Sequence, residues 1–415
     1  MEEESIAMLF SRSGGTLFPS LRFLSWGYGR PFPPLHTATH PLKILHLDCR
    51  YGDSLKCGDI IESVGNHCPL IMIFRLQLSR QSMEFDRLMS DLILRWSNLR
   101  VLECSEVALS ADAILHLSRV STLTYLSFAL SGEVSGQILL SSLLVFPNLT
   151  WCGIASGRPL LVANFFARTR LPAIKELTVR FSGSPSKQTI RSLMTALSNA
   201  CSSDTLTHLA ILSQHTLSRR LCSCGDVEFD DDPITYDELR PCVSLGNLRS
   251  LKLDLEQPIN LTDDLAELGS AWPYLEDFII NNDAGWRSTV NGGLTLHGLV
   301  RLLRACPALH NFSILLDTPT FTRIPEGMNA SFRPRQFGRV NLVESPLGAD
   351  MFSGVVDVFV AIKFSPRFLM AWRRVETDQR APMGWTPTGF RSWRDLADEV
   401  KARIAHVCSE SEDSK

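Results

Sequence analysis

A short pattern of apolar and polar positions recurs along most of the chain. Its clearest copy is Asn247–Leu253 (NLRSLKL), in which the leucines occupy positions that we number 1, 4 and 6. Apolar and polar residues alternate toward the end of each copy, which predicts a β-strand with one buried face. Position 1 of the successive copies is Leu21, Leu42, Ile73, Leu99, Leu123, Leu149, Ile174, Leu206, Leu248, Leu275 and Leu309.

A strand of this kind leaves its apolar face uncovered unless a similar strand packs beside it, so the repetition predicts a solenoid. Between the copies, apolar residues recur at helical spacing, and a proline often precedes the next strand, where it ends the helix. Ser110 and Thr262 are expected to cap two of these helices. The predicted helices are Met83–Leu94, Ala111–Leu117, Val134–Val145, Ser186–Leu197, Asp263–Leu268 and Leu294–Leu303.

The predicted fold class is α/β, a leucine-rich-repeat solenoid of about 11–13 irregular repeats. We expect a curved parallel sheet on its concave side and helices on its convex side. Residues 1–17 are predicted to form a short N-terminal stub, 18–372 the solenoid, 373–408 a C-terminal capping segment with a helix, and 409–415 a disordered tail. An acidic insertion at 213–243 is expected to form a loop.

The repeats resemble the leucine-rich-repeat part of fungal F-box/LRR proteins. Units of the form [Cys/Phe/Trp/Leu]-Pro-x-Leu-x-x-Leu-x-apolar carry the resemblance from Phe18 to Ile314, with degenerate copies at 337–342 and 365–372. The resemblance implies a non-catalytic solenoid that recognises a target protein for a ubiquitin ligase, with a Skp-type adaptor and a cullin as further partners. Residues 1–17 do not match the F-box that binds the adaptor. An F-box encoded upstream and an adaptor-free interaction scaffold therefore both remain open.

Composition narrows the possible functions. The formal net charge is −3 and 20% of residues are charged, which argues against nucleic-acid binding through a basic surface. No apolar run approaches the roughly 18 residues of a membrane span, and the acidic start Met1–Glu4 is unlike a signal peptide. We therefore expect a cytoplasmic or nuclear protein without membrane association. The eleven scattered cysteines are interpreted as buried thiols in a reducing compartment.

Three short motifs offer alternative chemistry. Gly52–Leu55 (GDSL) resembles the nucleophile block of GDSL esterases with Ser54 as nucleophile, but no histidine follows an aspartate at the Asp-x-x-His spacing of that family. Cys222 and Cys224 lack the second closely spaced ligand pair of structural zinc sites, although Cys242, His208 and His215 are near in sequence. The acidic run 226–232 lacks the ligand pattern of an EF-hand. We therefore predict no catalytic residue, no metal and no cofactor.

The remaining candidate is a surface. Side chains at position 3 of each repeat point away from the buried positions 4 and 6 and are expected to line the concave face. In the first repeats this position is largely apolar and aromatic, and in the later ones it is polar. Because exposed aromatic residues are favoured anchors at interfaces, we predict a partner-binding patch for a target protein. The patch consists of Phe23, Ile44, Val101, Tyr125, Trp151, Glu176 and His208.

Overall fold

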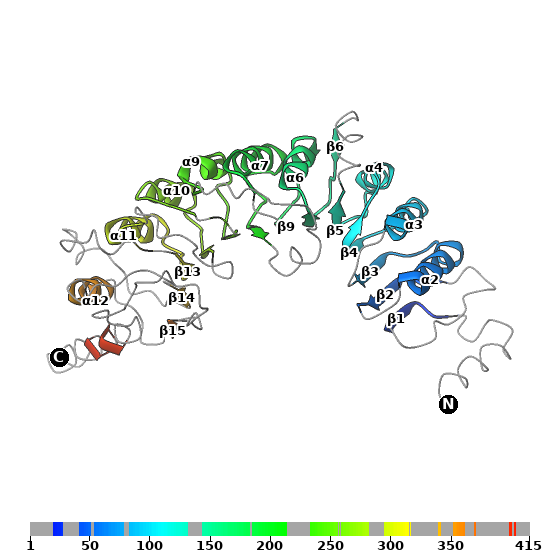
Figure 1. Cartoon of the computed structure of the whole chain (residues 1–415), viewed down its shortest axis with the longest axis horizontal. Coiled ribbons are helices and arrows are strands. Elements are labelled where there is room, and N and C mark those ends of the chain that lie inside the picture. Colours follow the sequence, from blue (N-terminus) through cyan, green and yellow to red (C-terminus); the bar gives the residue numbers. More distant parts are fainter. Residues whose placement is uncertain are drawn as a thin grey trace, which may run out of the picture. The chain divides into compact units, whose positions relative to one another are not determined.

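The chain folds into two compact units in the computed structural model (Figure 1). The first unit comprises Met1–Pro185, Ser192–Leu206 and Thr216–Leu221, and the second Ser186–Arg191, Thr207–His215 and Cys222–Lys415. The structure describes residues 20–27, 41–50, 54–78, 83–131, 143–182, 185–213, 233–255, 257, 259–281, 294–314, 316, 339–341, 352–361, 369–370, 398–400 and 402–403.

The first unit contains a parallel sheet in which neighbouring strands come from successive repeats. Its strands are joined in the order β1-β2-β3-β4-β5-β7-β9. They are β1 (Phe23–Gly27), β2 (Ile44–Cys49), β3 (Ile73–Leu78), β4 (Val101–Ala108), β5 (Tyr125–Leu130), β7 (Trp151–Ser156) and β9 (Glu176–Phe181).

Helices return the chain from one strand of the first unit to the next. They are α2 (Ser54–His67), α3 (Met83–Ile93), α4 (Ala111–Arg119) and α6 (Pro159–Ala167), and α7 (Lys187–Ala200) follows β9. A small second sheet pairs β6 (Leu144–Val145) with β8 (Thr169–Arg170). Figure 1 shows the helices α2 to α6 along one side of the sheet, and no described helix of this unit lies on the other side. We call that other side the open face.

The second unit has the same construction. Its parallel strands follow the order β10-β11-β12-β13-β14-β15. They are β10 (His208–Ser213), β11 (Ser250–Asp254), β12 (Asp277–Ile280), β13 (Asn311–Ser313), β14 (Arg339–Asn341) and β15 (Leu369–Met370). The helical segments are α9 (Tyr236–Leu239), the 3-10 helix η1 (Arg240–Ser244), α10 (Leu265–Ala271), α11 (Leu296–Ala305) and α12 (Phe352–Ala361). Strands and helices alternate in both units, which confirms the predicted leucine-rich-repeat solenoid.

The core forms where positions 1, 4 and 6 of each repeat meet the helices. Leu45, Leu126 and Leu253 are buried, and Phe128 at position 6 packs edge-on against Phe165 of α6, with ring centroids 5.9 Å apart. The apolar columns thus become one continuous layer between sheet and helices within each unit. Seven cysteines are buried and form no disulfide, namely Cys49, Cys68, Cys104, Cys152, Cys201, Cys242 and Cys306.

Two polar side chains inside this core form hydrogen bonds with backbone groups. The indole Nε1 of Trp96 donates to the carbonyl oxygen of Cys68 at 3.1 Å. Asn281 has a positive φ of 44° and is fully buried. Its side-chain oxygen accepts from the backbone N–H of Leu255, and its amide donates to the carbonyl of Gln257, both at 2.9 Å. These bonds satisfy backbone groups that a buried turn would otherwise leave unpaired.

Several local predictions are wrong. In the third repeat, Ile73 aligns with Ile44 and Val101, so it occupies position 3, and position 1 belongs to the buried Ile71. Arg75 accordingly lies at position 5. This shift by two residues keeps Leu76 buried and Arg75 on the sheet face away from the helices, because the side-chain period of a strand is two. Ile73, however, moves from the buried position 1 to position 3 on the other face.

Two helix predictions also fail in part. The end of the predicted helix Val134–Val145 is strand β6, which is held by a bond from the N–H of Leu144 to the carbonyl of Arg168 at 2.9 Å. Thr262 does not cap α10, whose N-cap residue is Asp264. The predicted cap Ser110 is confirmed, since its hydroxyl accepts from the N–H of Ala113 at 3.2 Å.

The sequence also left α2, α6, α9 and η1 unpredicted. The last two fall at the end of the insertion 213–243, so that part is helical and not a loop as predicted. The N-terminal stub, the centre of the acidic insertion (214–232) and the C-terminal tail lie outside the described residues. Of the capping segment, the helical residues 398–400 and 402–403 are described. Arg403 in this helix pairs with Asp357 of α12 at 2.6 Å. The domain boundaries themselves stay a prediction.

Candidate functional site

The position-3 side chains of the first unit lie side by side because the strands are parallel and in register. Neighbouring strands in a sheet are about 4.8 Å apart, so one residue from each repeat contributes to a continuous column. The column reads Phe23, Ile44, Ile73, Val101, Tyr125, Trp151 and Glu176. We call its members from Phe23 to Trp151 the apolar strip. The structure thus brings six of the seven predicted patch residues together and adds Ile73, while their role in binding stays a prediction.

Tyr125 and Trp151 form the most ordered part of this strip, and we call them the aromatic platform. They are direct partners across β5 and β7. Their rings are stacked face to face, with centroids 4.0 Å apart and an interplanar angle of 2°. Both side chains are only partly buried. A stacked aromatic pair contributes about 0.5–1.5 kcal/mol beyond the area it buries, so the pair is pre-ordered for contact.

Gly153 makes room for this arrangement. It lies at position 5 of the same strand as Trp151. A Cβ atom built there would lie 2.5 Å from Cη2 and 2.8 Å from Cζ3 of the Trp151 indole. The benzo edge of the indole therefore lies over Gly153. Any residue with a side chain at position 153 would push the ring away, and this role of glycine was not predicted from the sequence.

Charged side chains surround the platform. On the neighbouring strands at position 5, Arg75 pairs with Glu103 at 3.3 Å. Burial and the nearby Glu103 carboxylate raise the pKa of the Tyr125 hydroxyl to about 12. Glu106 is half-buried, and burial raises its pKa while the nearby Arg180 guanidinium acts to lower it. Tyr125 is therefore neutral at physiological pH and presents its hydroxyl as a hydrogen-bonding group.

The strip ends at Phe23, which is 50% exposed. Its ring meets the imidazole of His46 edge-on, with centroids 5.4 Å apart and an interplanar angle of 86°. Partial burial, with Arg75 nearby, lowers the pKa of His46. The imidazole is consequently uncharged at neutral pH and extends the apolar surface beside Phe23.

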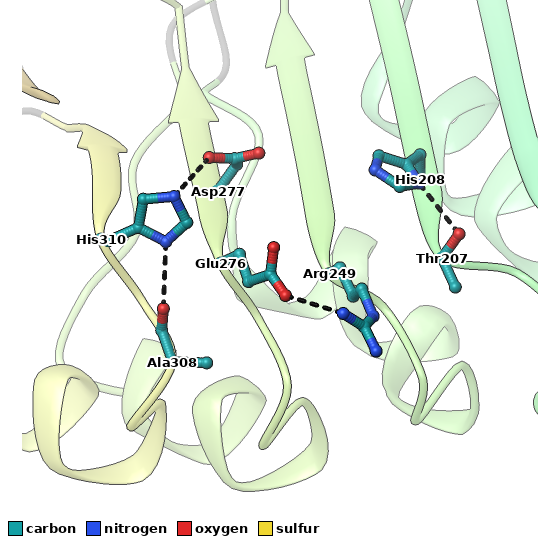
Figure 2. A network of polar contacts seen from close by, with 7 residues as sticks. All are labelled: Thr207, His208, Arg249, Glu276, Asp277, Ala308 and His310. Carbon is teal, nitrogen blue, oxygen red and sulfur yellow. Dashed lines mark hydrogen bonds and ion pairs between the residues drawn. The ribbon is translucent and has the colours of Figure 1, made fainter. Parts of the chain in front are cut away.

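In the second unit, we use the same name, open face, for the face of the sheet that carries position 3. Side chains on this face pair with one another (Figure 2). Arg249 and Glu276 form an ion pair at 2.9 Å. Asp277 lies 4.0 Å from Nε2 of His310 and accepts a hydrogen bond from Asn311 at 2.6 Å. The predicted patch residue His208 belongs to this polar face. Its Nδ1 lies 2.9 Å from the hydroxyl of Thr207, so its environment differs from that of the other six predicted residues.

The alternative chemistries find no added support. Ser54 is the first residue of α2, and the esterase hypothesis stays untested. Cys222 and Cys224 lie outside the described residues, and Cys242 is buried. In the described part of the chain, no group of three or more His, Cys, Asp or Glu side chains is arranged to hold a metal ion. Among those same residues, no helix is both long and apolar enough to cross a membrane.

Comparisons with known proteins give little beyond the fold. No protein-family model matches the chain, and no curated protein matches it. Among solved structures, the chain is similar to one described as plant peptide hormone receptor RGFR1 in complex with RGF2, with 13% sequence identity and a TM-score of 0.26. The match covers 85% of this chain and 57% of the receptor chain, so this chain spans little more than half of that receptor. At this TM-score the similarity carries no argument about function, and the leucine-rich-repeat assignment stands on the register and core of the structure itself.

Proposed function

We propose that the open face of the first unit binds a protein partner and that the aromatic platform is its anchor. The observation that carries the proposal is the stacked pair of Tyr125 and Trp151, which is held in register by two strands and left partly exposed above Gly153. Tyrosine and tryptophan dominate the binding energy of protein interfaces when a partner desolvates them. Because the rings are already ordered, binding costs little side-chain entropy here.

The polar atoms of the platform support this proposal. Buried indoles of this protein donate to backbone carbonyls, as Trp96 does to Cys68 and Trp272 to Cys242. In contrast, no described residue forms a hydrogen bond with Nε1 of Trp151 or the hydroxyl of Tyr125. These groups can therefore bond to a partner without breaking an internal bond, which favours an interface over a purely structural role.

The test compares two double variants of the full chain by affinity purification from cells. Tyr125→Ala with Trp151→Ala removes the platform. Met83→Ala with Leu160→Ala is the matched control, because both side chains are exposed apolar groups on helices, with exposed fractions of 77% and 53%. We expect the platform variant to lose proteins that the control and the wild type retain, while circular dichroism stays unchanged. Equal recovery from both variants would refute this placement of the site.

We further propose, on the resemblance to F-box/LRR proteins alone, that the bound protein is a target of a ubiquitin ligase. In that role this chain selects the target, and a Skp-type adaptor and a cullin join through an F-box. The alternative is an adaptor-free scaffold that uses the same face. Quantitative mass spectrometry of the purified protein separates the two, because only the first role predicts that an adaptor and a cullin remain when the platform is removed.

A further inference from the structure

A row of basic residues borders the apolar strip where the strands of the first unit begin. Position 2 of each repeat directly precedes the strip residue. The backbone there is fixed, since the N–H groups of Lys43 and Ile44 both donate to the carbonyl of Arg22, at 2.9 and 3.0 Å. Every charged residue at this position in the described repeats of the first unit is basic. These residues, which we call the basic row, are Arg22, Lys43, Arg100 and Lys175.

Three members of the basic row carry exposed charge. Arg22, Lys43 and Arg100 are exposed, and none of them forms an ion pair with a described residue. Cations on other parts of the same sheet are paired, as Arg75 is with Glu103. A row of unpaired like charges raises the free energy of the unbound protein, and an anionic partner relieves it.

The second unit shows that positions 2 and 3 share the open face. There His310, at position 2, reaches Asp277, at position 3 of the neighbouring strand, to within 4.0 Å (Figure 2). The repeat geometry is the same in the first unit, so the basic row lies alongside the apolar strip. Beyond position 5, at the opposite border of the strip, acidic and basic groups are balanced, because Glu106 lies near Arg180.

We infer that the partner of this face is a polypeptide segment with apolar or aromatic side chains on one side and carboxylates on the other. The inference rests on the proposed function. The apolar side chains contact the aromatic platform and the strip, and the carboxylates face Arg22, Lys43 and Arg100. A nucleic acid would also satisfy the cations, but it would leave Ile44, Ile73 and Val101 without an apolar counterpart. The apolar strip beside the basic row therefore favours an acidic, apolar peptide over a nucleic acid.

Selection from a displayed peptide library tests this inference with the full chain. The strip crosses six strands, roughly 24 Å at about 4.8 Å per strand, so random peptides of about 12 residues are long enough when extended. Peptides are selected on the wild type and then depleted on the variant carrying Tyr125→Ala and Trp151→Ala. We expect the remaining peptides to contain aromatic or aliphatic residues and about twice the acidic content of the input library.

Charge-reversed variants then locate the contact. The test variant carries Arg22→Glu, Lys43→Glu and Arg100→Glu. The control carries Arg87→Glu, Arg119→Glu and Arg168→Glu, which change the net charge equally at exposed positions of the same unit outside the open face. We expect the test variant to bind the selected peptides about ten-fold or more weakly, and the control to stay within about three-fold of the wild type.

The outcomes separate the two proposals. Platform-dependent peptides that are neutral or basic, or that bind the two charge variants equally, overturn the inference and leave the proposed function standing. A failure to recover any platform-dependent peptide counts against the proposed function itself. Displacement of the peptides by a single-stranded oligonucleotide, with the same loss in the test variant, would identify a polyanion site and overturn the polypeptide assignment. Circular dichroism of each variant confirms that it is folded before binding is compared.

Discussion

The position of the Trp151 indole over Gly153 leads to a prediction that isolates a single contact. In Gly153→Ala, the new Cβ would lie 2.5 Å from Cη2 of the indole, whereas ordinary contacts begin near 3.4 Å. The ring must therefore move by nearly 1 Å or leave the stack with Tyr125, which forfeits about 0.5–1.5 kcal/mol. Replacing glycine also restricts the unfolded chain, which stabilises the protein by about 0.4–1 kcal/mol where the backbone permits alanine.

Because these two effects oppose each other, the single variant is not decisive, and a double-mutant cycle with Trp151→Ala is required. Without the indole, the methyl group at position 153 still lies 3.0 Å from the hydroxyl oxygen of Ser127 but meets no ring. Gly153→Ala should therefore be less favourable for stability when the indole is present than when it is absent. We expect a coupling free energy of about 1–2 kcal/mol between the two sites, measured from urea unfolding of the four proteins.

Gly157→Ala provides the matched control. Its new Cβ would meet only the hydroxyl oxygen of Ser182, at 3.3 Å, so its effect should be the same with and without Trp151. The near-ultraviolet circular dichroism of Gly153→Ala should also change, since stacked aromatic rings contribute to it. If Gly153→Ala has the same effect on stability in both backgrounds, the indole does not rest on Gly153 and the account of the platform is wrong.

Three further predictions concern stability. Burial raises the pKa of Asp86 to about 6, above its unfolded value. Its contribution to the free energy of unfolding is therefore fully present below about pH 4 and is lost as the pH rises through about 6. Asp86→Asn should flatten the pH dependence of the urea midpoint between pH 4 and 7. Asn281→Ala should cost about 2–4 kcal/mol, because it leaves buried backbone groups unpaired, whereas the exposed Asn148→Ala, which loses one bond, should cost less than about 1 kcal/mol by the same assay. Ser110→Ala should cost about 1 kcal/mol through loss of the cap on α4, and an unchanged urea midpoint would count against that cap.

The fold could be predicted because the buried columns repeat, but the frame of one repeat could not. In the third repeat, two frames that differ by two residues both keep apolar residues inside and Arg75 outside. Alternation alone cannot distinguish them, since the side-chain period of a strand is two. The structure selects the frame that buries Phe74, whose ring lies against Trp96 with centroids 5.1 Å apart. The frame observed is therefore the one in which Phe74 of β3 packs against Trp96, just after α3.

Helix α6 was missed for a related reason. Its sequence, PLLVANFFA, is apolar on nearly every side, so it lacks the alternation of apolar and polar faces by which the other helices were predicted. Pro159 at its start is favourable at the first turn of a helix, yet elsewhere in this chain a proline precedes a strand. Val162 and Phe166 are buried in the folded protein. This tertiary packing supports the helix, and the local sequence pattern does not reveal it.

The candidate site was predictable only as a column of residues. The alternation placed Tyr125 and Trp151 on the open face, and the structure agrees. Their stacking depends on the rotamer of Trp151, which in turn depends on the missing side chain at Gly153, two residues away. The pairing of Arg75 with Glu103 depends on the register of the third repeat. Both features depend on contacts between neighbouring repeats, so the sequence of a single repeat does not reveal them.

The separation between buried and exposed columns explains how such a protein can acquire a partner without losing its fold. Stability comes from positions 1, 4 and 6, which exclude water, while positions 2, 3 and 5 are free to vary. A surface whose charges are already paired, as Arg249 and Glu276 are, gains little from a partner, because binding must first break or desolvate those pairs. The open face of the first unit instead presents stacked aromatic rings and the exposed cations Arg22, Lys43 and Arg100, which form no ion pair with any described residue. A partner bound there would meet these rings and cations without first breaking internal pairs, and this is the physical reason for proposing that the partner binds that face.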